Sequence, residues 1–154
     1  MQAMPQQNIN IQNRKARFNY EILDVYEAGL KLLGTEIKSI RLGKASLPES
    51  YCYFKGGELY IKNMHIAEYD YGNINNHEPL RERKLLLHKK ELEKLAAEVE
   101  KGNRTIVALK LYLNAKGLAK LQIALAQGKK IHDKRQSLKD KDVKREVERA
   151  LNRR

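Results

Sequence analysis

The clearest pattern in the chain is the alternation of apolar and polar residues in two neighbouring segments near its C-terminal third. In the first segment the apolar positions are Val107, Leu109, Leu111 and Leu113, with Thr105, Lys110 and Tyr112 between or beside them. In the second they are Ala119, Leu121, Ile123 and Leu125, with Lys120 and Gln122 between them. A period of two predicts two half-buried strands, which the residues 114–117 join into an antiparallel hairpin.

Two earlier segments also favour strands. A Gly-Gly pair at 56–57 separates the aromatic run 51–54 from the β-prone run 59–61, and such a pair supplies the positive φ angles of a tight hairpin turn. Phe18, Tyr20 and Ile22 alternate with polar residues and open a strand that runs to about Tyr26. A turn is expected at 28–29, after which 30–33 continues the strand.

Two helices and one loop complete the expected body. Thr35 is a candidate N-cap for a short helix that buries Ile37 and Ile40 and ends at Gly43. From Lys89, apolar residues recur with helical spacing and predict an amphipathic helix that stops at 102–103; these residues are Leu92, Leu95, Ala96 and Val99. The segment 69–80 is expected to be an irregular loop.

The order strand, hairpin, helix, hairpin predicts an all-β-dominated α+β fold. A helix between the third and fourth strands of a small closed sheet is typical of an OB-type barrel, and an SH3-like barrel has a similar number of strands. We therefore expect an OB-type closed barrel with flanking helices over 14–128. The Gln- and Asn-rich segment 1–13 is expected to be a disordered leader, and 129–154 a basic tail.

Positive charge is concentrated in the second half of the chain. Residues 1–80 hold nine Lys/Arg and nine Asp/Glu, whereas 81–128 and 129–154 each hold eleven against five, a net of +6 apiece. A neutral body followed by a cationic arm suggests a polyanionic partner, most simply nucleic acid. The tail also carries one helical apolar stripe, Val143, Val147, Ala150 and Leu151, behind a Ser137–Asp140 capping pattern. We expect it to be disordered in solution and helical on RNA.

Candidate chemistry is sparse. Cys52 is alone, which excludes an intramolecular disulfide and suits a reducing cytoplasm, and no apolar run is long enough for a membrane span. The four histidines, His65, His77, His88 and His132, show no metal-binding spacing. Glu36 and Glu58 could pair for acid/base chemistry, but solvated or salt-bridged carboxylates are the more common interpretation. We therefore expect the protein to have no enzymatic activity and to bind no cofactor and no metal.

Basic and aromatic residues point to RNA instead. Cations surround the leucines 85–87 and continue on the outer face of the last hairpin; they are Arg81, Arg83, Lys84, Lys89, Lys90, Lys110, Lys116 and Lys120. They predict a rim that contacts phosphates, and the alternative is a solvated approach to a helix with a buried leucine triplet. Tyr51, Tyr53 and Tyr60 could stack on bases or belong to the core or an edge. Without an RNP-type aromatic motif, recognition of folded RNA by shape is favoured over sequence reading.

Several motifs together resemble the SsrA-binding protein (SmpB) family, in order from about Asn13 to Arg149. They are N-R-K-A at 13–16, Y-E-A-G-L at 26–30, G-T-E-I-K-S-I-R at 34–41, R-E-R-K-L-L-L-H at 81–88 and G-K-K-I-H-D-K-R at 128–135. The resemblance implies an OB-type barrel that binds the tRNA-like part of tmRNA. It also implies a basic tail that enters the decoding region of a stalled bacterial ribosome, replaces the missing codon–anticodon pairing and permits trans-translation.

The resemblance also implies which residues act. Those at or beneath the tmRNA surface are Asn13, Lys15, Glu27, Leu86, His88 and Lys120. Gly128 is the hinge into the tail, and the decoding-region segment comprises Lys129, Lys130, His132, Asp133, Lys134 and Arg135. Asp140 and Asp142 dilute a stretch that is often more basic in the family. The partners implied are tmRNA and the small-subunit decoding region, and elongation factor Tu with alanyl-tmRNA is compatible with the same complex.

An acid at an RNA surface repels phosphate, so Glu27 is expected to accept from a base N–H or to organise a neighbouring Lys or Arg. Two other classes of protein share this composition: a structural ribosomal protein with a basic extension, and a small nuclease. A high-salt wash of ribosomes separates the first from an adaptor, and incubation with RNA tests the second.

Overall fold

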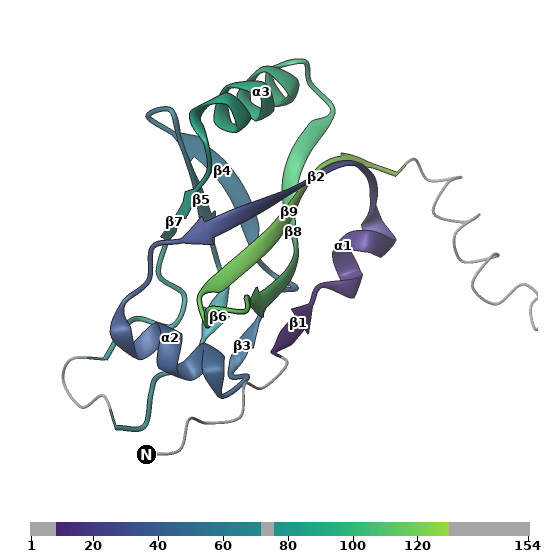
Figure 1. Cartoon of the computed structure of the whole chain (residues 1–154). Coiled ribbons are helices and arrows are strands. Elements are labelled where there is room, and N and C mark those ends of the chain that lie inside the picture. The colour runs from purple at the N-terminus through teal and green to yellow at the C-terminus, as the bar shows by residue number, and fades with distance from the viewer. Residues whose placement is uncertain (1–8, 72–75, 130–154) are drawn as a thin grey trace, which may run out of the picture.

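The computed structural model describes residues 9–71 and 76–129, which form a mainly antiparallel β-structure with three helices (Figure 1). In these residues a seven-stranded sheet has the order β1-β8-β9-β2-β7-β5-β4, and β3 pairs with β6. The elements are β1 Asn10–Gln12, α1 Arg14–Asn19, β2 Tyr20–Leu30, α2 Gly34–Arg41, β3 Ala45–Ser46, β4 Tyr51–Lys55, β5 Glu58–Lys62, β6 His65–Ile66, β7 Arg83–Leu86, α3 Lys89–Glu100, β8 Arg104–Leu113 and β9 Ala119–Gly128.

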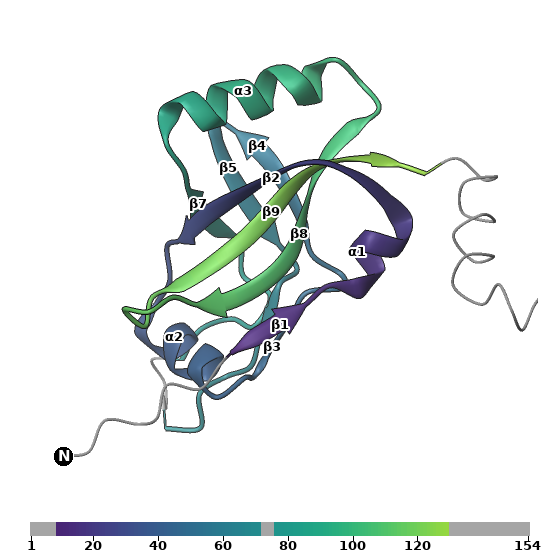
Figure 2. The same cartoon turned by 45° about the vertical axis from the view of Figure 1, so that its right-hand side comes forward.

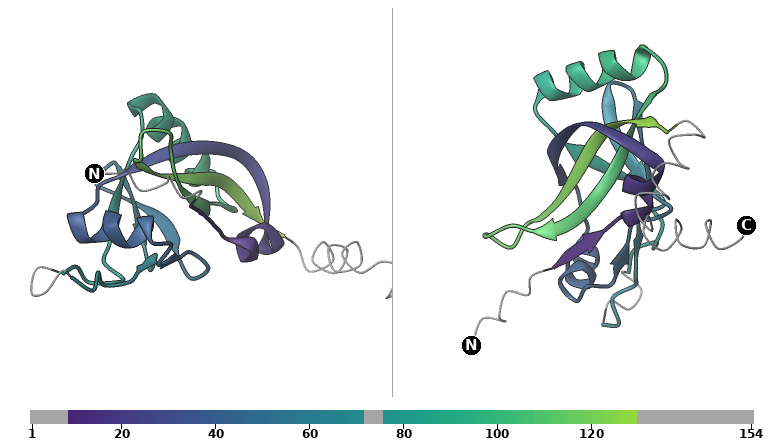
Figure 3. Two further views of the ribbon diagram at one scale, coloured as in Figure 1. Left: turned by 60° about the horizontal axis from the view of Figure 1, so that its bottom comes forward. Right: turned by 90° about the vertical axis from the view of Figure 1, so that its right-hand side faces the viewer.

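The sheet is strongly coiled. β8, β9 and β2 run side by side on one side, with β4 and β5 behind them (Figure 2). Helix α3 lies across one end of the sheet and α2 lies at the other end (Figure 3). The α+β class expected from the sequence is confirmed. The expected closed barrel is not seen, because the hydrogen-bonded ladders of the described residues leave β1 and β4 as the two ends of the sheet.

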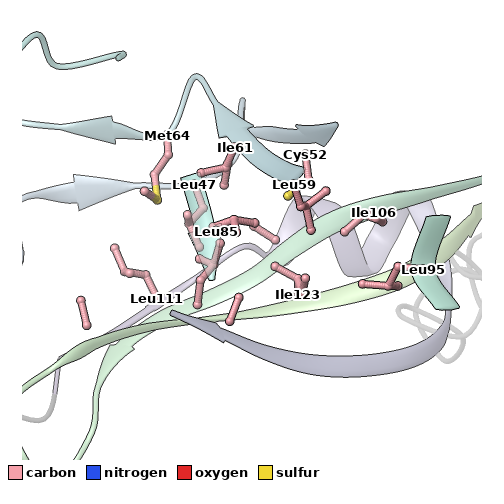
Figure 4. Close-up of a cluster of buried hydrophobic side chains, with 14 of the residues drawn as sticks. Leu47, Cys52, Leu59, Ile61, Met64, Leu85, Leu95, Ile106, Leu111 and Ile123 are labelled. Carbon is pink, nitrogen blue, oxygen red and sulfur yellow. The ribbon is translucent and has the colours of Figure 1, made fainter. Parts of the chain in front are cut away.

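The main core fills the space inside the coil. Side chains from β5, β7, β8 and β9 meet there, and Leu95 of α3 closes one end (Figure 4). Those with no exposed surface include Leu59, Ile61, Leu85, Leu95, Leu111, Leu121 and Ile123. The apolar face predicted for β9 is therefore confirmed, and so are the amphipathic helix α3 and the β4–β5 hairpin.

Strand β8 departs from the predicted alternation. The register of β8 with β9 shifts between Ala108 and Lys110, which places an extra residue, Leu109, in the strand. A bulge reverses which residues face inward. Ala108 and Leu111 face the main core, whereas Val107 and Leu109 pack on Ala16 of α1 in a second apolar cluster. The expectation that Val107 and Leu109 share a face with Leu111 is wrong for this reason.

The N-terminal part also differs from the sequence-based expectation. Residues 10–12 pair with β8 as β1, and Asn13 is buried, so the folded body includes 10–13 as well as the expected 14–128. Phe18 belongs to helix α1 instead of opening a strand. Strand β2 continues through 28–29 without the expected turn, because it is paired there with β7 and β9. Residues 1–8, the start of the predicted leader, lie outside the described residues.

Helix α2 begins two residues earlier than the Thr35 cap predicts. Its N-cap is Leu33, whose backbone N–H donates to Glu36 Oε1 at 2.7 Å. The Thr35 hydroxyl instead lies 2.8 Å from Nδ1 of the buried His77. Ile40 is buried and Ile37 packs against the core, as the sequence predicts.

A buried ionic cluster joins α2 to β7. Glu36 and Arg83 have no exposed surface, and Arg83 Nε donates to Glu36 Oε2. Arg81 donates to the same carboxylate from Nη2 at 2.8 Å and from Nε at 3.1 Å. Arg83 Nη1 also donates to the Met64 carbonyl at 2.6 Å. A buried charge pair of this kind is tolerated because nearly every donor and acceptor has a partner.

The surroundings of Glu36 determine how this cluster responds to acid. Burial alone would raise the pKa of the Glu36 carboxyl, but hydrogen bonds from Arg81, the Leu33 amide and Arg83 lower it overall. A carboxyl with a depressed pKa stabilises the fold above its unfolded-state pKa, about 4.3. That stabilisation is lost as the pH falls through the lower, folded-state value.

We predict that Glu36→Gln lowers the free energy of unfolding by about 3–5 kcal/mol at pH 7, because Arg83 is left buried without a carboxylate. Urea denaturation measures the loss. The control is Glu49→Gln, which breaks the exposed pair of Glu49 with Lys15 and should cost less than about 1 kcal/mol. The stability of Glu36→Gln should also fall less between pH 5 and 3, so similar costs for both variants and parallel pH profiles would contradict the assignment.

Candidate nucleic-acid interface

Four neighbouring strands place side chains in one row on the outside of the sheet. Antiparallel register sets Leu86 of β7 opposite Gly29 of β2, Gly29 opposite Lys120 of β9, and Lys120 opposite Tyr112 of β8. Directly opposite residues share a face. Leu86, Lys120 and Tyr112 face outward, because the residue next to each of them in its strand lies in the core. These neighbours are Leu85, Leu121 and Leu111, respectively. We call Leu86, Gly29, Lys120 and Tyr112 the cross-strand row.

A second set of residues lies beside this row on the same face. Glu27 is opposite Gln122, and Gln122 is opposite Lys110. The Tyr112 hydroxyl donates a hydrogen bond diagonally to Glu27 Oε2. The Lys110 ammonium lies 5.2 Å from the centroid of the Tyr112 ring, within the range of a cation–π contact. A carboxylate, Glu27, and two lysines, Lys110 and Lys120, therefore lie around the ring of Tyr112.

Burial and the contact with Glu27 both favour the protonated form of Tyr112. Burial, and then the hydrogen bond to and charge of Glu27, raise the pKa of Tyr112 to about 12. The phenol therefore remains a hydrogen-bond donor throughout the physiological range. It restrains one carboxylate oxygen of Glu27, which is otherwise exposed, and leaves the other available to accept from a ligand.

One end of the row opens into a hollow of about 330 Å³. Leu86 and Lys120 line it, together with Leu118 of the β8–β9 turn and with Leu33 and Ile37 of α2 and its cap. Leu86 is 49% exposed. Gly29 also lines it, and a Cβ at position 29 would lie 3.3 Å from the Leu86 Cβ, so that Leu86 would have to shift by a few tenths of an ångström. The result is an apolar concavity with a cation at its rim.

The residues selected from the sequence fall into two groups. Glu27, Leu86 and Lys120 lie together on the face just described, and His88 is exposed at the N-cap of α3, two residues beyond Leu86. Asn13 and Lys15 lie elsewhere, on α1 and its cap. Neither residue lies on the face that carries the cross-strand row.

Asn13 has a structural position. Its side chain accepts from the Ala16 amide at 3.1 Å and donates to the Ala108 carbonyl at 2.9 Å, and it is 4% exposed. The amide is therefore used within the fold and begins helix α1, which carries Lys15. Lys15 is exposed and forms a 3.0 Å ion pair with Glu49.

The predicted phosphate rim over 81–90 needs correction. Arg83 is completely buried and Arg81 is engaged with Glu36, so neither is a free phosphate ligand. The leucine triplet is not buried as a unit, since Leu85 is internal whereas Leu86 is on the surface. Lys89 and Lys90 remain exposed on α3.

The tail begins where β9 ends. Gly128 is the last residue of β9, and the Lys129 amide donates to the Asn19 carbonyl at 3.2 Å. Lys130, His132, Asp133, Lys134 and Arg135 lie outside the described residues, as do the predicted tail helix and its capping pair.

Tyr112 and Gln122 are two members of this face that the sequence-based assignment omitted. Period-2 alternation put both on the outer side of the hairpin, which was the available signal. The bond between Tyr112 and Glu27 spans 85 residues of sequence and has no local signature.

The acid/base alternative finds no support in the described geometry. Glu36 pairs with the two arginines, whereas Glu58 lies 3.6 Å from Lys84. Among residues 9–71 and 76–129, no three His, Cys, Asp or Glu side chains gather in a metal-binding arrangement. No helix in that part of the chain is long and apolar enough to cross a membrane.

Comparisons with known proteins agree on one family. The SmpB protein family matches residues 10–153. The SsrA-binding protein of Phocaeicola vulgatus is 61% identical, over 94% of this chain and 97% of that protein. The one from Bacteroides thetaiotaomicron is 57% identical over 97% and 100%. A solved structure described as "tmRNA-SmpB: a journey to the center of the bacterial ribosome" contains a chain with 47% identity and a TM-score of 0.68, over 84% of this chain and 94% of that one.

We predict that Tyr112 is among the last of the eight tyrosines to ionise. Absorbance at 295 nm reports ionisation cleanly because the chain has no tryptophan. Glu27→Gln should lower the pKa of Tyr112, since the negative charge that opposes the phenolate is removed, and more tyrosine should be ionised at pH 10.5. Tyr112→Phe should abolish this effect of Glu27→Gln. Coincident titration curves for the wild type and Glu27→Gln would disprove the contact.

Proposed function

The chain belongs to the SmpB protein family, and from this premise we propose that its cross-strand row and Glu27 form the surface that binds the tRNA-like domain of tmRNA. The protein is an RNA-binding adaptor of trans-translation whose partners are tmRNA and the ribosome. No chemical step by the protein itself is part of the proposal. The observation that carries the choice of surface is that Glu27, Leu86 and Lys120, distant in sequence, lie on one face.

The chemistry of this face suits folded RNA. Lys110 and Lys120 supply cations for backbone phosphates. Leu86 and the hollow beside it offer an apolar contact for a base or sugar, and recognition of folded RNA relies largely on shape and on 2′-hydroxyl and phosphate contacts. Glu27 would repel a phosphate, so it must accept a hydrogen bond from a base N–H or a 2′-hydroxyl. Tyr112 holds it ready to do so.

We propose a division of labour at Gly128. The body ends with β9, and the segment 129–154, of net charge +6, is assigned to the decoding region of the stalled ribosome. The proposed contact residues are Gly128 at the junction and, within the segment, Lys129, Lys130, His132, Asp133, Lys134 and Arg135. On this proposal the tail becomes helical there, where it replaces the missing codon–anticodon pairing.

The fold type, the further partners and the compartment are part of the same proposal. We assign the coiled sheet to the OB type, and the proximity of β4 to β8 across the coil supports this assignment. Elongation factor Tu and alanyl-tmRNA are proposed as further members of the complex. The working compartment is the cytoplasm, where stalled ribosomes and tmRNA occur.

Lys120→Glu should weaken binding to tmRNA and flatten its salt dependence by about one to two phosphate contacts. Gel shifts across a salt series provide both quantities. Lys101→Glu makes the same charge change at the end of α3, away from the row, and should leave the slope close to that of the wild type. An unchanged affinity and slope for Lys120→Glu would remove this face from consideration.

Glu27→Ala should reduce tmRNA affinity by about 1–3 kcal/mol, although it removes a negative charge, because a charge-assisted hydrogen bond is lost. Glu21→Ala removes another exposed carboxylate from the same strand and should leave affinity unchanged or raise it. Tighter binding by Glu27→Ala in an equilibrium binding assay would show that Glu27 is merely a tolerated surface acid.

Truncation after Lys130 should separate binding from function. The fold and most of the tmRNA affinity should remain, because β9 and the core precede the cut. Peptide tagging on ribosomes stalled at the end of a truncated message should be lost, and Ala at 133, 134 and 135 together should have a similar effect without shortening the chain. Tagging by the truncated protein at near wild-type rate would reduce the tail to an electrostatic tether.

A further inference from the structure

A stripe of tyrosine rings lies on strands that the proposed tmRNA surface does not use. Tyr53 of β4 is directly opposite Tyr60 of β5, and Tyr51 precedes Tyr53 by two residues on the same face. The Tyr53 and Tyr60 rings are stacked, with centroids 6.2 Å apart and planes 27° apart. Tyr51 and Tyr53 have centroids 5.8 Å apart with planes inclined by 36°. We call these three residues the tyrosine stripe.

The stripe faces solvent. The alternate positions Cys52, Leu59 and Ile61 are in the main core, so the three rings project from the opposite side of the hairpin. Tyr51 is 47% exposed, and the other two rings are half-buried against each other. The hairpin therefore presents a continuous aromatic surface that the core does not require.

Lysines surround the rings. The Lys55 ammonium lies 4.8 Å from the centroid of the Tyr60 ring. Lys62 is opposite Tyr51, and Lys84 of β7 is opposite Tyr60. Two glutamates offset part of this charge: Glu82 is 2.7 Å from Lys55 and Glu58 is 3.6 Å from Lys84. Lys62 is exposed and forms no ion pair within the described residues, so the surface retains a positive excess.

The Tyr51 end of the stripe leads into a second hollow, of about 140 Å³. Lys15 and Ser50 line it together with Tyr51. The Ser50 Oγ is buried and has no hydrogen-bond partner in the described part of the chain. A buried hydroxyl without a partner is uncommon in folded proteins. At the end of the aromatic surface this hollow also carries the Lys15 ammonium, which is exposed and lies 3.0 Å from Glu49.

We propose that the tyrosine stripe is a second RNA-binding surface, which stacks unpaired nucleobases and is separate from the cross-strand row. Aromatic rings bind bases of any sequence through their faces, and adjacent cations hold the phosphates that link those bases. The positive excess fits RNA better than an apolar protein segment, since a protein partner would have to desolvate the lysines. The adaptor then holds two RNA segments on different parts of the coiled sheet.

The test uses the full chain and two RNA probes. One is an unstructured twelve-nucleotide RNA, and the other is the same backbone with its central bases removed, so that the two probes carry equal charge. The wild type should bind the complete probe about tenfold more tightly than the abasic one. Replacing Tyr51, Tyr53 and Tyr60 with Leu should reduce this ratio to about one, whereas Tyr71→Leu, a change at an 81% exposed tyrosine outside the stripe, should preserve it.

The ratio isolates base stacking from the charge of the tail, which acts on both probes alike. Circular dichroism checks the fold of the triple variant, and if that variant does not fold, Tyr51→Leu alone should lower the ratio several-fold. Equal binding of both probes by the wild type, or an unchanged ratio in a folded stripe variant, would overturn the proposal. Lys120→Glu should weaken tmRNA binding without changing the ratio, so failure of the tmRNA surface and failure of the stripe are distinguishable.

Discussion

Strand β2 is hydrogen-bonded along both edges, to β9 on one side and to β7 on the other, and the rest of the sheet depends on this double pairing. It joins the β1-β8-β9 segment of the sheet to the β7-β5-β4 segment. It also brings Leu86 and Lys120 to either side of Gly29, where a side chain would crowd Leu86. The proposed tmRNA surface therefore arises from strand register, and a slip of one residue would turn its members into the core.

The buried Glu36–Arg83 pair complements this pairing by fixing α2. Leu33 and Ile37, from the cap and body of that helix, form one wall of the hollow beside Leu86. The same carboxylate binds the Leu33 amide, so the cap, the helix and β7 are positioned by one group. Stability and the shape of the hollow beside Leu86 thus share a cause. On the proposed function, Glu36 would influence RNA recognition without contacting RNA, because it positions residues that line this hollow.

Local periodicity was sufficient to predict β9, the β4–β5 hairpin and α3, because each has one apolar face with regular spacing. It failed where distant residues decide the outcome. The bulge at Leu109 and the short helix α1 depend on packing between Ala16 and β8, and the burial of Arg83 depends on Glu36. Family motifs identified Glu27, Leu86 and Lys120, but only the fold explains their proximity and reveals Tyr112 as the partner of Glu27.

The central claim is that tmRNA contacts the hollow end of the outer β7-β2-β9-β8 face. Methyl NMR of leucine-labelled protein, titrated with the tRNA-like domain of tmRNA, tests it most directly. Leu86 and Leu118 are 49% and 54% exposed and line the hollow, whereas Leu23 is 39% exposed near the far end of β2. The account predicts that the methyl signals of Leu86 and Leu118 shift or broaden while those of Leu23 stay in place. Perturbation of Leu23 with unchanged Leu86 and Leu118 would contradict it.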